Sequence, residues 1–287
     1  MAQKLKPFYE NVQAHYDLSD DFFALFLDPT RTYSCAYFKD ESMTLEQAQI
    51  AKVDLSLSKC DLQPGHKLLD IGCGWGTTAI RAAEEYGVDS IGITLSKNQQ
   101  AYASSREVKG DQNVEFRLQG WEEFTEPVDR IVSIGAFEHF RHQRHAEFFQ
   151  KCRELLPDDG QMLLHTIVLN SLPTLKELGV KVGPEDVAFA KFIIKEIFPG
   201  GQLCDPERIK KFSADNGFSV EHVEPLRLHY ARTLDIWAEN LEKAKSEAIE
   251  LTSEEVFDRY MKYLTWCADS FRKGFIDVMQ FRLHCLS

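Results

Sequence analysis

The sequence contains no stretch that could serve as a membrane anchor. None of its 287 residues belongs to an unbroken apolar run of about 18, roughly what a membrane-spanning helix needs. The first ten residues, MAQKLKPFYE, also lack the apolar core of a signal peptide. We therefore expect a cytoplasmic protein whose contact with membranes is peripheral at most.

Positive charge is also scarce. Lys and Arg number 33 against 45 Asp and Glu, so the formal net charge is -12 at pH 7. Nucleic-acid binding depends mainly on Lys and Arg that displace counterions from the phosphate backbone, and an excess of acid opposes it. We expect no nucleic acid among the partners.

The sequence holds no recognisable disulfide or metal motif. Its seven cysteines are scattered and odd in number, and no two have the CxxC spacing of a zinc site. His139, His142 and His145 recur every third residue, but no cluster of carboxylates accompanies them. We expect reduced thiols and no metal.

What the sequence does contain is the alternating pattern of an α/β fold. From Lys67 onward, β-rich runs such as KLLDI, VDSIGITL and DRIVSIG alternate with helical segments. Such alternation predicts right-handed βαβ crossovers and a parallel sheet with helices on both faces. Before it, Ser19 and the capping-box pattern from Thr44 to Gln47 predict the starts of two helices.

We expect the whole chain to form a single domain, residues 1–287. Its parts are predicted as an N-terminal helical cap (1–62), a cofactor-binding core (63–168), a helical insertion over the substrate site (169–204) and the remainder of the core (205–287). The insertion is inferred because the alternation of strands and helices breaks there. Two later helices are expected near 233–249 and 253–270, before a last strand in IDVMQFRLH.

A glycine-rich turn follows the first of these strands. In LLDIGCGWG, at residues 68–76, a hydrophobic strand runs into three glycines ahead of a helix, so a ligand can approach the backbone closely. The dinucleotide fingerprint G-x-G-x-x-G is absent, and the second strand ends at Thr94 without the acid that binds a ribose. The compact turn and Asp70 favour S-adenosylmethionine over NAD, and a tight turn without a ligand is the alternative.

Longer motifs extend this interpretation along nearly the whole chain. They include HYDLSDDFFALFLDPTRTYSCAYF, GITLSKNQ, LQGWEEF, DRIVSIGAFEHF, EIFPGGQL, HYARTLDIWAENL and RYMKYL. Together with LLDIGCGWG they resemble the mycolic acid cyclopropane synthases, S-adenosylmethionine-dependent enzymes that modify double bonds in very long lipids. The resemblance implies a class I methyltransferase fold. This is a Rossmann-like seven-stranded sheet, mostly parallel with an antiparallel last strand, with N-terminal helices and a helical insertion covering the lipid site.

The resemblance also implies the contacts to S-adenosyl-L-methionine. Tyr33 and Ser34 are expected at its methionine end, and Trp121 with Glu122 at its adenine. Further contacts are expected around the amino acid, from Leu68, Leu69, Asp70, Ile71, Gly72, Cys73, Gly74, Trp75 and Gly76, and around the ribose, from Thr94, Leu95, Ser96, Lys97, Asn98 and Gln99. Gln99 can replace the missing ribose acid, and Trp121 offers a flat face to adenine.

The segment SIGAFEHF, at residues 133–140, places Glu138 between two phenylalanines at the end of a predicted strand. Methyl transfer to an alkene leaves a carbocation, which aromatic faces and a nearby anion can stabilise. The resemblance implies that a bound bicarbonate is the base, held by Glu138, His165, Tyr230 and the backbone near Cys35. For each residue taken alone, a solvated acid or a core histidine is the alternative.

Other residues of this segment bear on the product. Tyr16, Phe137 and Phe140 are expected in the wall that stabilises the cation. In hydroxylating relatives a Glu commonly replaces the glycine of SIGAFEHF, so Gly135, expected beside the cofactor, favours cyclopropanation. A methyl-branched or hydroxylated product is the alternative, as is a lipid-binding protein without turnover. Cys267 in YLTWCADSF matches a cysteine sometimes regarded as catalytic, although methyl transfer to an alkene needs no thiolate.

A long unsaturated acyl chain requires an apolar tunnel. Ten buried methylenes at about 0.8 kcal/mol each contribute roughly 8 kcal/mol before ordering costs. The lining is expected from the helix of residues 19–27 and from Phe189, Phe192, Ile193 and Phe198. Lys191 and Lys195 lie four residues apart and are expected on one helical face, where they can meet an acidic acyl carrier protein.

Overall fold

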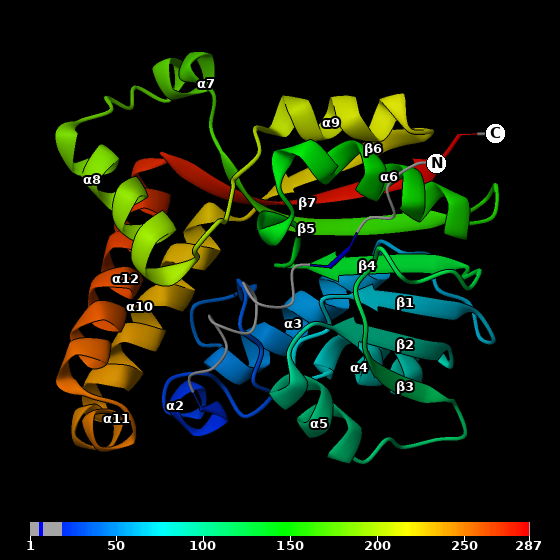
Figure 1. Cartoon of the computed structure of the whole chain (residues 1–287), viewed down its shortest axis with the longest axis horizontal. Coiled ribbons are helices and arrows are strands. Elements are labelled where there is room, and N and C mark those ends of the chain that lie inside the picture. The colour runs from blue at the N-terminus through cyan, green and yellow to red at the C-terminus, as the bar shows by residue number, and fades with distance from the viewer. Residues whose placement is uncertain (1–5, 8–18, 287) are drawn as a thin grey trace.

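The core of the structure is a seven-stranded sheet. The computed structural model describes residues 6–7 and 19–286, and the strands lie in the order β3-β2-β1-β4-β5-β7-β6 (Figure 1). They are β1 Lys67–Ile71, β2 Asp89–Thr94, β3 Val114–Leu118, β4 Arg130–Ile134, β5 Gln161–Leu169, β6 Phe218–Pro225 and β7 Ile276–Cys285. Strand β7 runs antiparallel to both of its neighbours, whereas β1 to β5 pair in parallel. The expected sheet, mostly parallel with an antiparallel last strand, is confirmed.

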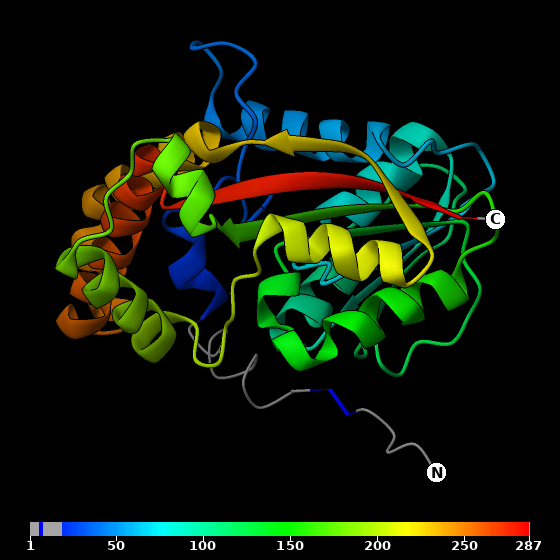
Figure 2. The ribbon, with the colours of Figure 1, turned by 90° about the horizontal axis from the view of Figure 1, so that it is seen from above.

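Helices cover both faces of this sheet (Figure 2). The α-helices are α2 Asp20–Ala24, α3 Leu45–Ser58, α4 Thr77–Tyr86, α5 Lys97–Ser105, α6 His145–Leu155, α7 Leu172–Glu177, α8 Pro184–Phe192, α9 Pro206–Asp215, α10 Arg227–Lys243, α11 Lys245–Leu251 and α12 Glu254–Lys273. On one face, Leu57 of α3 packs in a cluster with Leu68 of β1. On the other, Phe148 of α6 packs in a cluster with Leu69. Neighbouring residues of one strand thus anchor opposite layers.

The predicted starts of the first two helices are confirmed. The Ser19 hydroxyl accepts a hydrogen bond from Phe22 N–H (3.2 Å), and a capping box formed by Thr44 and Gln47 opens α3. The later helices differ from expectation, because α10 begins well before residue 233 and gives way to α11 at Ala244. No Gly or Pro marks that break in the sequence, so local signals could not locate it.

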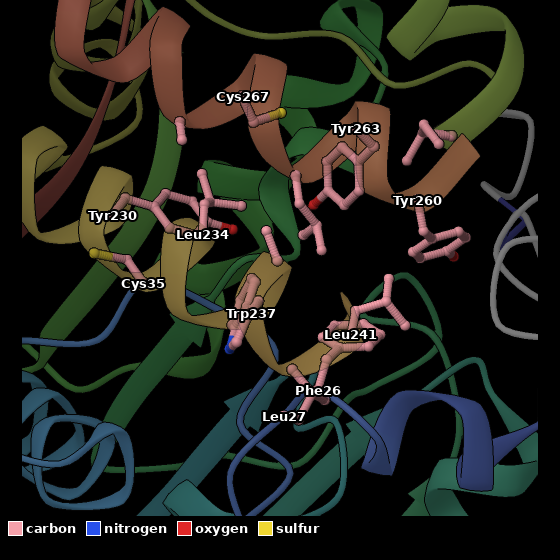
Figure 3. Close-up of a cluster of buried hydrophobic side chains, with 14 of the residues drawn as sticks. Phe26, Leu27, Cys35, Tyr230, Leu234, Trp237, Leu241, Tyr260, Tyr263 and Cys267 are labelled. Atoms are coloured by element: carbon pink, nitrogen blue, oxygen red, sulfur yellow. The ribbon is translucent and has the colours of Figure 1, made fainter. Parts of the chain in front are cut away.

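A helical layer closes the carboxyl ends of the strands. Helices α10 and α12 lie side by side at this end of the sheet, with α8 beside α12 (Figure 1). Tyr230 and Leu234 project from α10 toward Tyr263 and Cys267 of α12, whereas Trp237 points toward Phe26 (Figure 3). All of these residues belong to one buried cluster. This layer gives the edge of the sheet an apolar cover.

Backbone geometry fixes the glycine turn after β1. Gly76, at the start of α4, has a φ of 89°, a left-handed conformation, and a Cβ there would lie 2.6 Å from Cζ of Phe116. Gly65 has nearly the same φ, 86°, but no atom lies within 4 Å of the place its Cβ would take. Substituting alanine at each glycine therefore distinguishes two destabilising effects. Both variants suffer backbone strain, but only the variant at Gly76 also suffers crowding of the new side chain.

We expect Gly76→Ala to destabilise the fold more than Gly65→Ala. Left-handed strain costs each variant on the order of 1–2 kcal/mol. Crowding against Phe116 adds roughly 1–3 kcal/mol in the first variant alone. Urea unfolding followed by circular dichroism measures both, and equal destabilisation would show that Phe116 moves aside without cost.

Candidate active site

Helix α3 fixes the segment that connects it to α2. Gln49 Nε2 donates to the carbonyl oxygens of Thr32 (3.1 Å) and Ser34 (2.8 Å). Lys52 donates from Nζ to the Ser34 hydroxyl oxygen (2.8 Å), and both helix side chains are buried. The segment carrying Tyr33 and Ser34 is thereby held in place beside the end of the sheet.

A cavity of about 130 Å³ lies at the carboxyl ends of β1, β2 and β4. It gathers most of the residues predicted to contact the cofactor, namely Tyr33, Ser34, Asp70, Ile71, Gly72, Cys73, Gly74, Trp75, Thr94, Leu95, Gln99, Trp121, Glu122 and Gly135. These residues come from five separate segments of the chain. We call this space the polar cavity because two carboxylates and a lysine line it.

Six predicted contacts do not line the polar cavity. They are Leu68, Leu69, Gly76, Ser96, Lys97 and Asn98. The two leucines are buried in the hydrophobic layers on either face of the sheet. The glycine precedes α4, the serine caps α5 by accepting a hydrogen bond from Gln99 N–H (3.3 Å), and the last two are exposed. The motifs were predicted as whole segments, whereas only part of each segment faces the cavity.

Sequence reasoning also missed residues of this cavity, among them Lys52, Gln119, Gly120 and His139. Gln119 and Gly120 directly precede Trp121 in LQGWEEF, so that motif could have revealed them. Lys52 carries no such signal. A lysine on a helix is normally exposed, and the burial of this one follows from tertiary packing alone.

Two carboxylates of the polar cavity have an oxygen without a hydrogen-bond partner among residues 6–7 and 19–286: Oδ2 of Asp70 and Oε2 of Glu122. Burial raises the pKa of Asp70 to about 7, although the charge of Lys52 opposes the change. Burial also raises the pKa of Glu122, whose Oε1 accepts from Arg144 Nη1 (2.8 Å). Such acceptors are costly to bury unless a ligand donates to them. The cavity therefore fits a ligand that carries N–H donors.

A second cavity, of about 360 Å³, has a mainly apolar wall, and we call it the apolar cavity. Helices α10 and α12 contribute Tyr230, Leu234, Tyr263 and Phe271 to it, and the segment around α8 contributes Phe189, Ile193 and Phe198. Three of the four tunnel residues predicted in the insertion therefore line it. Phe192 does not, because its ring packs edge-on against Trp266, with 5.9 Å between the centroids. The prediction that the helix of residues 19–27 also lines it is wrong, because none of those residues borders this cavity and Phe22, Phe23, Phe26 and Leu27 pack in the buried cluster instead.

Glu138 and His165 bring polar atoms to this apolar wall. Ile167, two residues after His165 on β5, donates its N–H to Glu138 Oε1 (2.6 Å), and burial raises the pKa of Glu138 to about 6. Burial and two nearby lysine charges lower the pKa of His165 well below its usual value. In the described part of the chain, neither Oε2 of Glu138 nor Nε2 of His165 has a hydrogen-bond partner. These two atoms can bind a small polar group.

All four residues predicted around bicarbonate line the apolar cavity: Glu138, His165, Tyr230 and Cys35. The Cys35 thiol donates to the Ala36 carbonyl oxygen (3.2 Å), and burial raises its pKa well above the usual value. A neutral thiol in this position packs like a small apolar group.

The two cavities meet. Tyr33, Ser34, Gly135 and His139 line both of them. Burial lowers the pKa of His139 to about 4, so the imidazole is neutral at pH 7. A ligand in the polar cavity and a second, apolar ligand in the apolar cavity can therefore touch at one place. The walls around that place carry little charge.

Comparison with known proteins agrees with this geometry. Residues 3–281 match the family model described as mycolic acid cyclopropane synthetase. The chain belongs to this family. It is 56% identical over 285 residues to cyclopropane mycolic acid synthase MmaA2 of Mycobacterium tuberculosis, covering 99% of each chain. It is 57% identical over 282 residues to the S-adenosylmethionine-dependent methyltransferase UmaA of that organism, covering 98% of this chain and 99% of the relative.

Solved structures place the fold in the same family. The structure of MmaA2 from Mycobacterium tuberculosis superposes with a TM-score of 0.96, and it covers 98% of this chain and 100% of that one. The structure of CmaA1 complexed with SAH and CTAB, 54% identical, superposes with a TM-score of 0.94 and the same coverage. The protein is thus an S-adenosylmethionine-dependent methyltransferase of the cyclopropane synthase type.

No helix in the described part of this family member combines the length and apolar character needed to cross a membrane.

The two phenylalanines of SIGAFEHF lie in different surroundings. Phe137 stacks on His145, with 4.1 Å between ring centroids, and is buried in the layer beneath α6, so it lines neither cavity. Phe140 lines the polar cavity and not the apolar one. The prediction that Phe137 faces the cation is wrong, because the 3-10 turn Phe137–His139 directs its ring into the core, whereas the role predicted for Phe140 stays a prediction. Tyr16 lies outside the described residues.

The three histidines spaced every third residue do not act together. His139 lines both cavities and His142 lines the apolar one, while the rings of His142 and His145 are 5.2 Å apart and each bonds a backbone carbonyl. Among residues 6–7 and 19–286, no group of three or more His, Cys, Asp or Glu side chains is placed to hold a metal ion.

Cys267 lies on the wall of the apolar cavity in this methyltransferase. Burial raises the pKa of its thiol far above the usual value, so it stays protonated at neutral pH. A thiol reacts as a nucleophile through its thiolate form, and this environment suppresses it. Its surroundings are those of an apolar packing residue.

We expect iodoacetamide to leave Cys267 unmodified in the native protein at pH 7.5. All seven cysteines are free and buried, and reaction requires an accessible thiolate. Mass spectrometry of tryptic peptides measures labelling before and after unfolding in urea, and the unfolded protein, labelled at all sites, is the control. Selective, rapid labelling of Cys267 in the native protein would restore it as a candidate nucleophile.

Proposed function

We propose that this methyltransferase converts a double bond of a long mycolic acyl chain into a cyclopropane, with S-adenosylmethionine as methyl donor. The observation that carries the proposal is the junction of the two cavities at Tyr33, Ser34, Gly135 and His139. A cofactor in the polar cavity and an acyl chain in the apolar cavity would touch only at the reacting atoms. The names of the relatives, and a relative's structure complexed with SAH and CTAB, support this assignment.

The polar cavity suits the two ends of the cofactor. Asp70 Oδ2 would accept from its amino group, and Lys52, 2.8 Å from the Ser34 hydroxyl, would bring positive charge near its carboxylate. The adenosine would lie against Gln99, Trp121 and Glu122, whose Oε2 can accept from the adenine amino group. When bound, the cofactor supplies an electrophilic methyl group on a sulfonium sulfur.

We expect cofactor affinity to rise with pH up to about 7. The pKa of Asp70 is about 7, so below that pH the side chain is protonated and must lose its proton to accept from the cofactor's amino group. Calorimetry with S-adenosylhomocysteine between pH 5.5 and 7.5 measures the change, roughly tenfold per pH unit on the acid side. Asp70→Asn should bind more weakly with a flat profile. A flat profile for the unmodified protein would contradict this role for Asp70.

Catalysis needs a protected cation and a base. After methyl transfer, positive charge develops on the neighbouring carbon of the chain, where the rings of Tyr33, Tyr230 and Tyr263 can stabilise it. Bicarbonate fits between Glu138 and His165, because each presents a buried polar atom without a partner in the described structure. It would supply the base for the proton that leaves the transferred methyl as the ring closes.

Gly135 favours cyclopropanation over hydroxylation. Its φ is 68°, and a Cβ there would have only Cβ of Ser34 within 4 Å, at 3.8 Å. A side chain at this position would extend into the junction of the cavities. A polar one could hold water beside the cation, and glycine offers no such group.

The substrate chain would be covered by the insertion of residues 169–204, within a single methyltransferase domain spanning residues 1–287. Ile194 lines the apolar cavity and is 54% exposed, so the cavity wall reaches the surface there. We propose that the chain enters at this point, from the cytoplasm, with peripheral membrane contact at most. Seven buried free thiols suit that reducing compartment.

An acyl carrier protein could present the chain at the same place. Lys191 and Lys195 are both exposed near Ile194. They do not share one regular α-helix as predicted, because a π-helical turn, Ile193–Ile197, follows α8 and Lys195 pairs with Glu196 (2.8 Å). Lys191 is therefore the better candidate for contact with an acidic carrier.

The experiment that tests the function supplies the purified protein with methyl-labelled S-adenosylmethionine and a long monounsaturated acyl lipid. We expect a gain of one labelled methylene per double bond and upfield ring protons in the NMR spectrum. Depleting bicarbonate from the buffer should abolish turnover, and adding it back should restore turnover. Gain of a methylene plus water would replace the proposal with hydroxylation, and no labelled lipid would remove it.

Glu138→Gln is expected to lower kcat by about 100-fold, the size of effect seen when one preorganised group is lost from a reacting centre. Affinity for S-adenosylhomocysteine should not change, because Glu138 lines only the apolar cavity. Glu147→Gln, on the exposed side of α6, is the matched control. Unchanged turnover in the Glu138 variant would contradict its place in the mechanism.

A further inference from the structure

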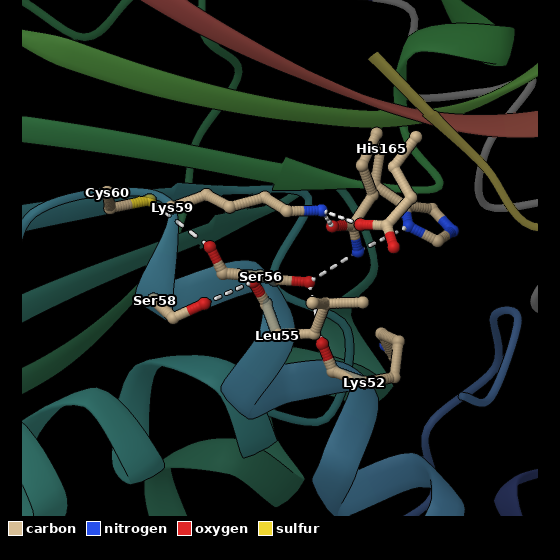
Figure 4. A network of polar contacts seen from close by, with 9 residues as sticks. Lys52, Leu55, Ser56, Ser58, Lys59, Cys60 and His165 are labelled. Atoms are coloured by element: carbon tan, nitrogen blue, oxygen red, sulfur yellow. Dashed lines mark hydrogen bonds and ion pairs between the residues drawn. The ribbon is translucent and has the colours of Figure 1, made fainter. Parts of the chain in front are cut away.

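His165 belongs to a chain of hydrogen bonds that runs away from the apolar cavity. On strand β7, Gln280 lies directly opposite His165 of β5 and directly opposite Glu224 of β6. Lys59, which ends α3, reaches over the sheet and contacts both Gln280 and Glu224 (Figure 4). The register of three adjacent strands thus aligns an acid, an amide and an imidazole under one ammonium group.

The orientation of the Gln280 amide is fixed at both ends. Lys59 Nζ lies 2.5 Å from Oε1, and an ammonium group can only donate, so this atom is the amide oxygen. The other amide atom, Nε2, lies 3.0 Å from the Ser56 hydroxyl. That hydroxyl donates its proton to the Lys52 carbonyl oxygen (2.8 Å) and so must accept from Gln280. The contacts with Lys59 and with Ser56 therefore independently support the same orientation of the amide.

The amide in turn determines where His165 carries its proton. Nε2 of Gln280 has two protons, and the second points to Nδ1 of His165, 3.2 Å away. Nδ1 must therefore be the acceptor, and in a neutral imidazole the proton then sits on Nε2. Nε2 of His165 is the buried atom without a partner in the described structure, and His165 lines the apolar cavity.

We propose that Lys59, Ser56 and Gln280 are positioning residues that hold His165 as the Nε2–H tautomer, a hydrogen-bond donor toward the apolar cavity. His165 is then unable to take the substrate's proton itself. With Glu138 as acceptor and His165 as donor, the pair matches a hydrogen carbonate ion, which has one O–H and an acceptor oxygen. This catalytic consequence rests on the proposed function, but the tautomer does not.

Burial and charge support the same protonation state. Gln280 and Ser56 are fully buried, and His165 is 1% exposed, so water does not compete for these bonds. Burial, together with the charges of Lys52 and Lys59, lowers the pKa of the imidazole and keeps it neutral. Glu224 pairs with Lys59 and holds its ammonium group in place.

The test reads the tautomer directly. Two-bond proton–nitrogen NMR spectra of the full-length protein, with labelled histidine and at pH 8, distinguish an Nε2–H from an Nδ1–H imidazole, and His165→Asn assigns the signal. We expect Nε2–H in the unmodified protein. In Gln280→Glu, the carboxylate accepts from both Lys59 and His165, so the tautomer should switch to Nδ1–H and kcat should fall by about 100-fold.

A matched control lies in the same strand pair. Gln161→Glu makes the same charge change on β5, but there the side chain faces Arg282 (3.1 Å) and not His165. It should keep the Nε2–H signal and wild-type turnover. Lys59→Arg retains a donor opposite Oε1 and should keep the tautomer, whereas Lys59→Met should give a mixture of tautomers.

Either of two results would overturn the inference. An Nδ1–H imidazole in the unmodified protein would show that Gln280 does not orient His165, even if no variant folds. A switched tautomer in Gln280→Glu with unchanged kcat would show that the orientation has no catalytic role. Failure of the proposed function is distinguishable, because the unmodified protein would then show the expected tautomer without turning over the acyl lipid.

Discussion

The site depends on the burial of polar atoms that the protein itself does not satisfy. Oxygens of Asp70, Glu122 and Glu138 and one nitrogen of His165 lack partners among residues 6–7 and 19–286. Each such atom costs on the order of 1–3 kcal/mol relative to a bonded one. The surrounding structure has to be rigid enough to hold them there. A ligand that supplies the missing partners recovers this energy on binding, so the atoms mark where ligands belong.

That rigidity comes from elements on opposite sides of the sheet edge. Helix α3 holds the segment around Ser34 through Gln49 and Lys52, and it reaches the far strands through Lys59. Helices α10 and α12 close the same edge with aromatic and aliphatic side chains. One sheet edge therefore offers two environments, a polar one over β1, β2 and β4 and an apolar one under the helical layer. The division allows a charged cofactor and a hydrocarbon chain to meet without sharing a pocket.

Sequence patterns predicted the elements whose signals are local. The glycines after β1, the capping box at Thr44 and the alternation of strands and helices all depend on neighbouring residues, and the structure agrees with them. The burial of Lys52 and the alignment of Gln280 with His165 depend on which strands pair, which no local pattern specifies. Phe137 shows the same limit. Its neighbour Glu138 reaches the apolar cavity, whereas the ring of Phe137 points into the core. A 3-10 turn that the sequence did not predict directs the two side chains apart.

The placement of an anion beside Glu138 would fail in an ordinary apolar pocket, because two negative charges would repel each other there. Burial raises the pKa of Glu138, but the hydrogen bond from Ile167 N–H opposes this change and the pKa is about 6. This carboxylate is therefore ionised at neutral pH. Lys52 and Lys59 lie close enough to lower the pKa of His165. Their positive charges act across the same low-dielectric region in which an anion would bind, where charges are screened less than in water. The lysines therefore assist burial in keeping the imidazole neutral, and their positive charge would favour an anionic base bound beside His165.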